Sequence, residues 1–309
     1  MRKEIKTAVV DISSLKVQGA RNVAKAAVQA LMLQAELSSA TNAHSLAKEL
    51  AQLKAVLAHT RPTEPMMRNL LDDAAAFVAE EAKRAKSARA LRAAFIARET
   101  QVLEKMDKDA HKLYEYGAKL IPKNATVLTH CHSSTVTGIL KVAHKTNRGL
   151  RVIACETRPR FQGRITAAEL VAAGIDTTFV VDGAANMFMK QADLVLVGAD
   201  SVTSRGDLIN KVGTSMLAHI ARMHDISFYS AAELGKYSTS TFYGELEKIE
   251  ERAAVEVWDK PPKKLHVRNP AFDVTAAKYI NGFVTEVGVI PPQSFFALAT
   301  EKLKLKIFK

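Results

Sequence analysis

Short apolar runs rich in Val and Ile alternate with stretches of helical periodicity from Ala125 onward, and this alternation constrains the fold more than any other feature. The runs, each followed by its helical stretch, are Thr126–Thr129 and Val136–His144, Arg151–Cys155 and Thr166–Ala173, Thr178–Val181 and Ala184–Met189, Leu194–Val197 and Val212–His224, then Ser227–Ser230, with a last run at Gly282–Glu286. Strands separated by helices indicate βαβ units, because parallel neighbours need a long crossover connection. The sequence therefore predicts an α/β fold with a doubly wound, mainly parallel, Rossmann-like sheet.

The first 122 residues follow a different pattern. Apolar residues recur there at helical spacing, for example at Val23, Ala27, Ala30 and Leu31, with Lys, Arg and Glu between them. Two prolines interrupt the pattern at Thr60–Pro65. We expect a helical N-terminal domain at residues 1–122, a Rossmann-like domain at residues 123–309, and an active site in the cleft between them.

Composition limits where the protein acts. Of the 309 residues, 48% are apolar, which is enough for a sizeable core. No apolar segment is long enough to span a bilayer, and the first residues lack the apolar stretch of a secretory signal. Cys131 and Cys155 are the only cysteines and lack Cys-x-x-Cys spacing. We therefore expect a cytoplasmic protein without disulfides.

The formal net charge of +12 raises nucleic-acid binding as an alternative. However, the basic residues are mixed with acidic ones, and no basic stretch carries interleaved aromatic residues, so nucleic acid is not the expected partner. No G-x-G-x-x-G follows the first run, and Gly235–Tyr237 lacks the rest of a phosphate-binding P-loop. The histidines of His130–His132 have no further ligand cluster in the sequence, so we expect neither a cofactor nor a metal.

The residues that close the parallel strands are expected to meet at one edge of the sheet, where ligands bind in open α/β folds. Cys131 precedes a helix whose free N–H groups would attract an anion and depress the thiol pKa; the alternative is a buried, unreactive cysteine. Asp200 follows an apolar run and a Gly-Ala pair, so partial desolvation would raise its pKa towards general acid–base use. The alternative for Asp200 is a cap or turn residue.

Other polar residues near the strand ends have two interpretations. Arg158 and Lys236 would bind a phosphate or form surface salt bridges. Asn210–Thr214 is expected to open a helix, with Asn210 either at the N-cap or in the site. Thr166–Glu169 fits a capping box at a helix start.

Several motifs, in matching order, resemble those of the superfamily that contains sugar-phosphate isomerases and the regulatory subunits of initiation factor 2B. They are His-Cys-His-Ser-Ser at 130–134, Glu-Thr-Arg-Pro at 156–159, Gly-Ala-Asp-Ser at 198–201, Asn-Lys-Val-Gly-Thr at 210–214 and Asn-Pro-Ala-Phe-Asp-Val-Thr at 269–275. The likeness extends to Gly19–Ala20, Arg61–Thr63 and Gly288–Pro292, so it covers nearly the whole chain. Within the superfamily, the archaeal ribose-1,5-bisphosphate isomerases are the most similar group.

The resemblance implies an aldose–ketose isomerase of AMP salvage with Cys131 and Asp200 as its catalytic pair. The hypothesis is that Cys131 exchanges a proton with substrate carbon while Asp200 handles a proton on oxygen, through an enediol-like phosphoenolate. The sequence does not decide which group acts at which atom, and a hydride shift is the alternative. Candidate phosphate donors are Gly19, Ala20, Arg21, Arg61, Ser133, Arg158 and Lys236, with Asn210 and Lys211 near the sugar hydroxyls.

Two rival functions follow from the same superfamily: a methylthioribose-1-phosphate isomerase, and a non-catalytic regulatory subunit. The regulatory subunits generally lack the cysteine and aspartate pair, so its presence favours the enzyme. Departures from the isomerase pattern are Gln18 before Gly19, Glu64–Pro65 after Arg-Pro-Thr, and Arg205 in the turn after Asp200. The resemblance also implies a homo-oligomer, either a dimer or a hexamer.

Overall fold

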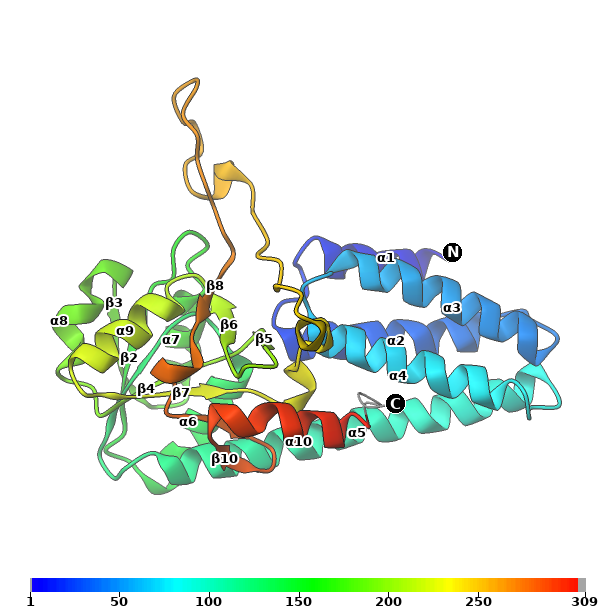
Figure 1. Ribbon diagram of the computed structural model, residues 1–309, viewed down its shortest axis with the longest axis horizontal. Coiled ribbons are helices and arrows are strands. Elements are labelled where there is room, and N and C mark those ends of the chain that lie inside the picture. Colours follow the sequence, from blue (N-terminus) through cyan, green and yellow to red (C-terminus); the bar gives the residue numbers. More distant parts are fainter. Residues whose placement is uncertain (1, 305–309) are drawn as a thin grey trace. The chain divides into compact units, whose positions relative to one another are not determined.

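A computed structural model describes residues 2–304 of the chain (Figure 1). The chain divides into two compact units, Met1–Lys108 and Asp109–Lys309. The division falls inside the long helix α5 (Ala88–Leu120), so this helix contributes to both units. The predicted domain boundary at residues 122 and 123 lies just beyond the end of α5 and stays a prediction.

The first unit is helical, as the periodicity predicted. Its other helices are α1 (Lys3–Ser13), α2 (Ala20–Leu37), α3 (Ala43–Thr60) and α4 (Pro65–Glu81). Their starts follow local chemistry: Gly19 takes a φ of 85° ahead of α2, the Asn42 side chain accepts a hydrogen bond from the Ser45 N–H, and Pro65 opens α4. The buried stripes of the helices form one apolar core, which includes Val23, Leu46, Leu71, Leu91 and Phe95.

The second unit is built on a seven-stranded sheet with the order β10-β9-β7-β4-β1-β2-β3. The strands are β1 (Thr126–Thr129), β2 (Arg151–Cys155), β3 (Asp176–Val180), β4 (Leu194–Val197), β7 (Ser227–Ala231), β9 (Gly282–Thr285) and β10 (Gly288–Ile290). All neighbours pair in parallel except β10, which runs antiparallel to β9. The predicted doubly wound, mainly parallel sheet is therefore confirmed, and its strand order reverses direction between β1 and β4.

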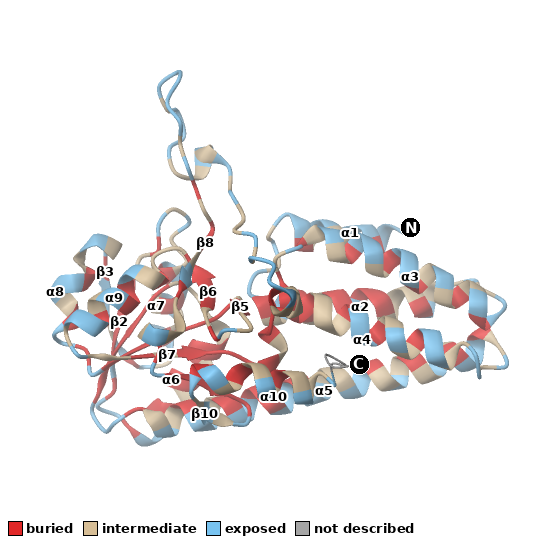
Figure 2. Ribbon diagram, viewed as in Figure 1, coloured by how far each residue is buried: buried red, intermediate tan, exposed pale blue. Residues whose placement is uncertain are grey.

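Helices cover both faces of this sheet, and its inner strands β9, β7, β4, β1 and β2 are mostly buried between them, whereas the edge strands β10 and β3 are more exposed (Figure 2). One face packs against α6 (Ser134–Thr146), α7 (Gly163–Ala172) and the end of α5. The other packs against α8 (Ala185–Met189), α9 (Thr214–Met223) and α10 (Phe295–Lys302). Successive strand residues alternate between the two cores, as Val127 and Leu128 do, because side chains of a strand point to opposite faces.

A second, three-stranded sheet was not predicted. It pairs β6 (Leu208–Lys211) antiparallel with both β5 (Ser201–Val202) and β8 (Phe272–Thr275). The expectation that Asn210 and Lys211 open a helix is therefore wrong: both lie on β6, and Gly213 precedes α9. Between η3 (Thr239–Tyr243) and β8 the chain projects away from the sheet as a long loop that contains η4 (Ala254–Glu256) (Figure 1).

Candidate active site

Cys131 lies in the turn between β1 and α6, at the carboxyl edge of the sheet. The predicted sequence of strand, turn and helix is present: Ser133 precedes α6, and its Oγ accepts a hydrogen bond from the Val136 N–H at 3.4 Å. Cys131 itself has a φ of 66°, in the left-handed region that few residues other than glycine adopt. The chain thus leaves the extended conformation of β1 at Cys131.

Two threonine hydroxyls hold the backbone of Cys131. Its N–H donates to Thr157 Oγ1 at 2.8 Å, and its carbonyl oxygen accepts from Thr166 Oγ1 at 2.9 Å. Thr166 was expected in a capping box, but α7 begins at Gly163 and the side chain of Thr166 reaches across to the neighbouring turn. That expectation is wrong because the helix starts one turn earlier than its sequence pattern indicates.

Asp200 and Lys211 lie near the thiol of Cys131. Burial raises the pKa of Cys131 to about 12; the charge of Lys211 lowers it and the charge of Asp200 raises it. The expectation of a depressed thiol pKa is therefore wrong, since the desolvation that accompanies burial outweighs Lys211 and the start of α6. Asp200 is anchored through its own N–H, which donates to the Ile209 carbonyl of β6 at 3.0 Å.

Gly198 allows the end of β4 to approach the start of α6. A Cβ atom at this position would lie 2.8 Å from both Cβ and Oγ of Ser133, and 3.9 Å from Oδ1 of Asn210. Ser133 and Asn210 therefore both lie beside the last residues before Asp200. The Nδ2 of the buried Asn210 donates to Thr214 Oγ1 at 3.0 Å, which holds its amide in place.

The two predicted basic residues beyond the strand ends have partners within the second unit. Lys236 is buried, and its Nζ donates to the carbonyl of Ala199 at 2.7 Å, next to Asp200. Arg158 is exposed at the edge of the site, where its Nη2 donates to the Val257 carbonyl at 2.8 Å and its Cζ lies 5.0 Å from the centre of the Phe161 ring. Within residues 2–304, neither Arg158 nor Lys236 forms the surface salt bridge that was its alternative interpretation; both donate to backbone carbonyls.

The remaining candidates, Gly19, Ala20, Arg21 and Arg61, belong to the first unit. Arg21 donates to Asp107 Oδ1 at 2.6 Å and to the Met106 carbonyl at 2.9 Å. Arg61 is buried and donates to Glu64 Oε1 at 2.5 Å. Glu64, one of the departures from the isomerase pattern, is thus the acidic partner of Arg61. The part these residues play in substrate binding stays a prediction.

His130, Cys155 and Asp182 offer three possible metal-ligand atoms within 4.8 Å of one another. The hydrogen bonds around them indicate a different role. His130 Nε2 is 3.0 Å from the Val212 carbonyl, and the carboxylate of Asp182 accepts from the N–H groups of Thr157 and Arg158 at 2.9 and 2.7 Å. Since these donors and acceptors already serve the protein, we interpret the group as a structural hydrogen-bond network.

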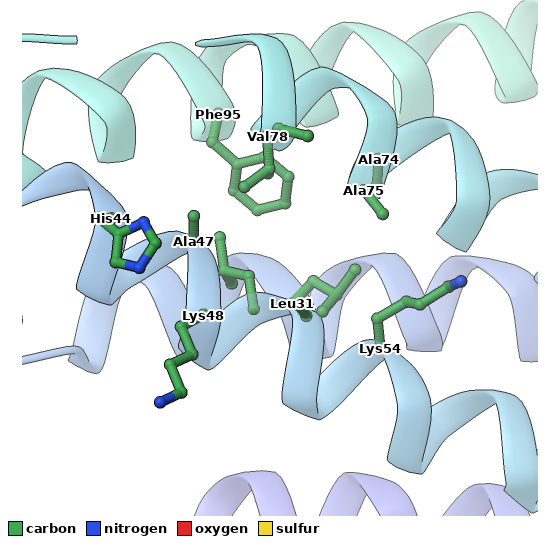
Figure 3. Close-up of a pocket in the computed structure, with 12 residues that line it drawn as sticks. Leu31, His44, Ala47, Lys48, Lys54, Ala74, Ala75, Val78 and Phe95 are labelled. Carbon is green, nitrogen blue, oxygen red and sulfur yellow. The ribbon is translucent and has the colours of Figure 1, made fainter. Parts of the chain in front are cut away.

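A cavity of about 420 Å³ lies elsewhere, among α2, α3, α4 and α5 of the first unit (Figure 3). Leu31, Val78 and Phe95 line its interior, and the amines of Lys48 and Lys54 point away from it. No predicted site residue lines this cavity. Its apolar walls offer few groups for a sugar phosphate.

One residue that the sequence analysis did not single out organises the site from β8. Asp273 accepts hydrogen bonds from the N–H groups of Gly213 at 2.7 Å and Ser215 at 3.1 Å, and so caps α9. Gly213 has a φ of 102°, and a Cβ there would lie 3.1 Å from His130 Nε2. The motif at 269–275 that carried part of the resemblance therefore fixes α9 against the Cys131 turn. Its role depends on pairing across 60 residues, which no local pattern reveals.

Fold and site together define a doubly wound α/β protein with a thiol and a carboxylate where the strand order reverses. The chain belongs to the initiation factor 2 subunit family, whose model matches residues 16–292. A relative from Pyrococcus furiosus, named ribose 1,5-bisphosphate isomerase, is 38% identical over 300 residues, covering 94% of this chain and 91% of that protein. The resemblance stated from the motifs is confirmed.

Two solved structures from Pyrococcus horikoshii OT3 share the fold. One is described as translation initiation factor eIF-2B; it has a TM-score of 0.79 and 26% identity, covering 94% of this chain and 98% of that one. The other is 5-methylthioribose 1-phosphate isomerase, with a TM-score of 0.78 and 29% identity, covering 97% and 87%. Among the described residues of the present chain, no helix has the length and apolar character needed to cross a membrane.

Proposed function

We propose that this protein is an aldose–ketose isomerase that converts ribose 1,5-bisphosphate to ribulose 1,5-bisphosphate, in the salvage of AMP and nucleosides. The observation that carries the proposal is the pairing of Cys131 with Asp200, which follow adjacent strands at the reversal point of the sheet and interact electrostatically. The relative from Pyrococcus furiosus supports the choice of substrate, since its name specifies this reaction.

The reaction requires ring opening and the transfer of a proton from C2 to C1. In the first step, the Cys131 thiolate removes the proton from C2, the bond between C1 and the ring oxygen breaks, and Asp200 protonates that oxygen. The product of this step is an enol phosphate. In the second step, Asp200 accepts the proton of the C2 hydroxyl while Cys131 returns its proton to C1, which yields the ketose. Each proton-transfer group would contribute roughly 10²–10⁴-fold to the rate.

Cys131 and Asp200 together carry one proton in this scheme. Because burial raises the pKa of Cys131 to about 12, its thiol is protonated in the free protein at neutral pH. The scheme therefore requires that, once substrate is bound, this proton passes to the carboxylate of Asp200 to produce the thiolate. A thiolate of high proton affinity is a strong base, as removal of a proton from carbon requires.

We propose that phosphate and hydroxyl groups are bound at the carboxyl edge of the sheet in the second unit. Ser133 and the N-terminus of α6 present N–H and O–H donors, and Lys211, Lys236 and Arg158 supply positive charge. Asn210 would contact the sugar hydroxyls. Gly19, Ala20, Arg21 and Arg61 of the first unit are the further candidates for binding phosphate.

The alternative substrate is 5-methylthioribose 1-phosphate, on which the second Pyrococcus horikoshii protein acts according to its description. That substrate carries a thioether where ribose 1,5-bisphosphate carries its second phosphate, so the excess of basic residues among the candidates favours the bisphosphate. A third possibility is a regulatory subunit, in which the Cys131 and Asp200 pair would have no catalytic role.

One assay separates the three. Purified protein is incubated with either sugar phosphate, and ketose formation is followed over time. We expect ribulose 1,5-bisphosphate from ribose 1,5-bisphosphate at a kcat/KM at least about 100-fold above that for the thioether substrate. The opposite ratio would assign the protein to the methylthioribose group, and no ketose from either substrate would favour the regulatory function.

The proposal includes a homo-oligomer, either a dimer or a hexamer. Light scattering from purified protein would distinguish the two by mass, starting from a chain mass of 33.7 kDa. A monomer at micromolar concentration would contradict this part of the proposal without affecting the reaction.

A further inference from the structure

The backbone conformation of Cys131 carries a cost that other parts of the site must offset. A non-glycine residue in the left-handed region is disfavoured, since its Cβ approaches the following carbonyl. Cys131 has a φ of 66°, and so does Thr157, a β-branched residue for which the conformation is still less favourable. Strained residues of this kind persist only where surrounding contacts determine them, and they concentrate at functional sites.

Thr157 and Thr166 provide those contacts for Cys131. Each threonine holds one backbone group of Cys131. Thr157 Oγ1 accepts from the Cys131 N–H at 2.8 Å, and Thr166 Oγ1 donates to the Cys131 carbonyl at 2.9 Å. Both threonines are buried. Thr157 is held in turn by Asp182, whose Oδ1 accepts from the Thr157 N–H at 2.9 Å.

The two histidines that flank Cys131 continue these hydrogen bonds outward. His132 Nδ1 lies 3.2 Å from Thr166 Oγ1, and His130 Nδ1 lies 3.4 Å from Thr157 Oγ1. Because His130 Nε2 donates to the Val212 carbonyl at 3.0 Å, Nδ1 of a neutral His130 can only accept. The one proton of the Thr157 hydroxyl is shared between this Nδ1 and the Cys155 carbonyl, which is nearer at 3.2 Å. Because the Thr166 hydroxyl donates to Cys131, it accepts from Nδ1 of His132.

These contacts form two separate arms on Cys131: Thr166, beside His132, holds the carbonyl oxygen, and Thr157, beside His130, holds the N–H. The alternation of the His-Cys-His motif places both imidazoles where they reach these hydroxyls. The histidines therefore serve the backbone of Cys131 rather than a metal.

We propose that Thr157 and Thr166, oriented by His130 and His132, are positioning residues that lock Cys131 in its left-handed conformation and so aim its thiol at the substrate carbon. The proposal rests on the proposed function, in which Cys131 exchanges a proton with C2 and C1. None of the four side chains needs to touch substrate for this role. A misplacement of the thiol by about 1 Å would cost on the order of 10²-fold in rate.

Paired substitutions test the role of each hydroxyl. Thr157→Val and Thr166→Val remove it with little change of shape, whereas Thr157→Ser and Thr166→Ser keep it. Thr177→Val, on β3, is the control, because the Thr177 hydroxyl donates to the nearby Ile175 carbonyl at 2.9 Å and not to the Cys131 turn. Two properties are measured: kcat and KM for ribose 1,5-bisphosphate, and the rate at which iodoacetamide alkylates Cys131 at pH 8, with the Cys131 and Cys155 peptides resolved by mass spectrometry.

For both valine variants we expect kcat to fall about 10- to 100-fold with KM within about twofold of the parent protein. We also expect alkylation of Cys131, which is partly buried in the parent protein, to accelerate at least about threefold as its thiol becomes more accessible. The serine variants and Thr177→Val should stay within about threefold of the parent in both properties. A general loss of folding would not give this contrast between valine and serine. If the valine variant of one threonine fails to fold, the valine and serine variants of the other threonine provide the same test.

Unchanged kcat and alkylation in both valine variants would overturn the proposal, and so would serine variants that lose as much as the valine variants. The alkylation contrast is independent of turnover. If the parent protein formed no ketose, the proposed function would fail, while the alkylation rates would still show whether the threonine hydroxyls hold Cys131.

Discussion

At the scale of single residues, the protonation of Cys131 determines what the site can do. Burial raises the pKa of the thiol to about 12; the charge of Lys211 lowers this pKa, and the charges of Asp200 and Asp182 raise it. A cysteine at the start of a helix is commonly acidified, but here desolvation is the larger effect. The role that we propose for Cys131 is therefore that of a proton carrier of high affinity rather than a permanently ionised nucleophile.

A pH prediction follows from this pKa. If Cys131 and Asp200 share one proton, kcat/KM should be constant from about pH 7 to pH 10, because the pair loses that proton only as the pH approaches 12. Alkylation of Cys131 by iodoacetamide requires the thiolate and should instead rise about tenfold per pH unit over the same range. A decline of kcat/KM above pH 8 would contradict the shared proton, as would an alkylation rate that levels off near pH 8.

The sequence identified Cys131 and Asp200 as candidates because both follow apolar runs and match motifs, but it missed the residues that hold them. Thr166 was assigned to a capping box, and Thr157 had no assigned role. Their hydroxyls contact Cys131 across 35 and 26 residues, respectively. Contacts of that range depend on how α7 and the end of β2 pack, which no local pattern encodes.

At the scale of elements, the close approach of β4 and α6 brings the site together. Gly198, at the end of β4, leaves room for Ser133 at the start of α6. The parallel strands were predictable because buried strands form continuous runs of Val, Ile and Leu. The three-stranded sheet was not predictable from local patterns, because β5 has only two residues and β6 pairs with β8 across more than 60 residues. The short polar segment at Asn210 instead has the pattern of a helix start.

Gly198→Ala tests this approach. The added Cβ would lie 2.8 Å from two atoms of Ser133, so α6 must shift. We expect a loss of about 1–3 kcal/mol in the free energy of unfolding, as for other overpacked positions, together with a lower kcat. Urea denaturation and the isomerase assay measure the two effects.

Gly183→Ala is the matched control for that substitution. No atom lies within 4 Å of the position where its Cβ would be, so we expect a change within about 0.5 kcal/mol. Equal effects of the two alanine substitutions would show that Gly198 is not needed for the packing of α6 on β4.

At the scale of the whole molecule, a buried cluster of charges ties distant parts of the second unit together. Lys302 of α10 donates to Asp109 Oδ2 at 2.7 Å, 193 residues away, and to the buried Glu286, which in turn accepts from the Leu234 N–H. Burial opposes the charge on Lys302, but Glu286 and Asp109 hold its pKa above the ordinary value. The lysine remains charged because it neutralises two carboxylates.

Lys302→Met removes the cation and leaves both carboxylates in place. We expect a loss of about 3–5 kcal/mol in the free energy of unfolding, because breaking a buried pair strands an uncompensated charge. Lys145→Met, at an exposed position of α6, should change it by less than about 0.5 kcal/mol. Thermal and urea denaturation of both variants measure the difference; similar values would mean that water already screens the cluster.

The most direct test of the account is the turnover of ribose 1,5-bisphosphate by Cys131→Ser and Asp200→Asn, compared with the parent protein. Both changes preserve size and leave the backbone contacts of the site intact. We predict a fall in kcat of roughly 10²–10⁴-fold or more in each variant, with unfolding curves close to that of the parent. Ketose formation at the parent rate by either variant would remove that residue from the mechanism and contradict the proposed Cys131–Asp200 pair.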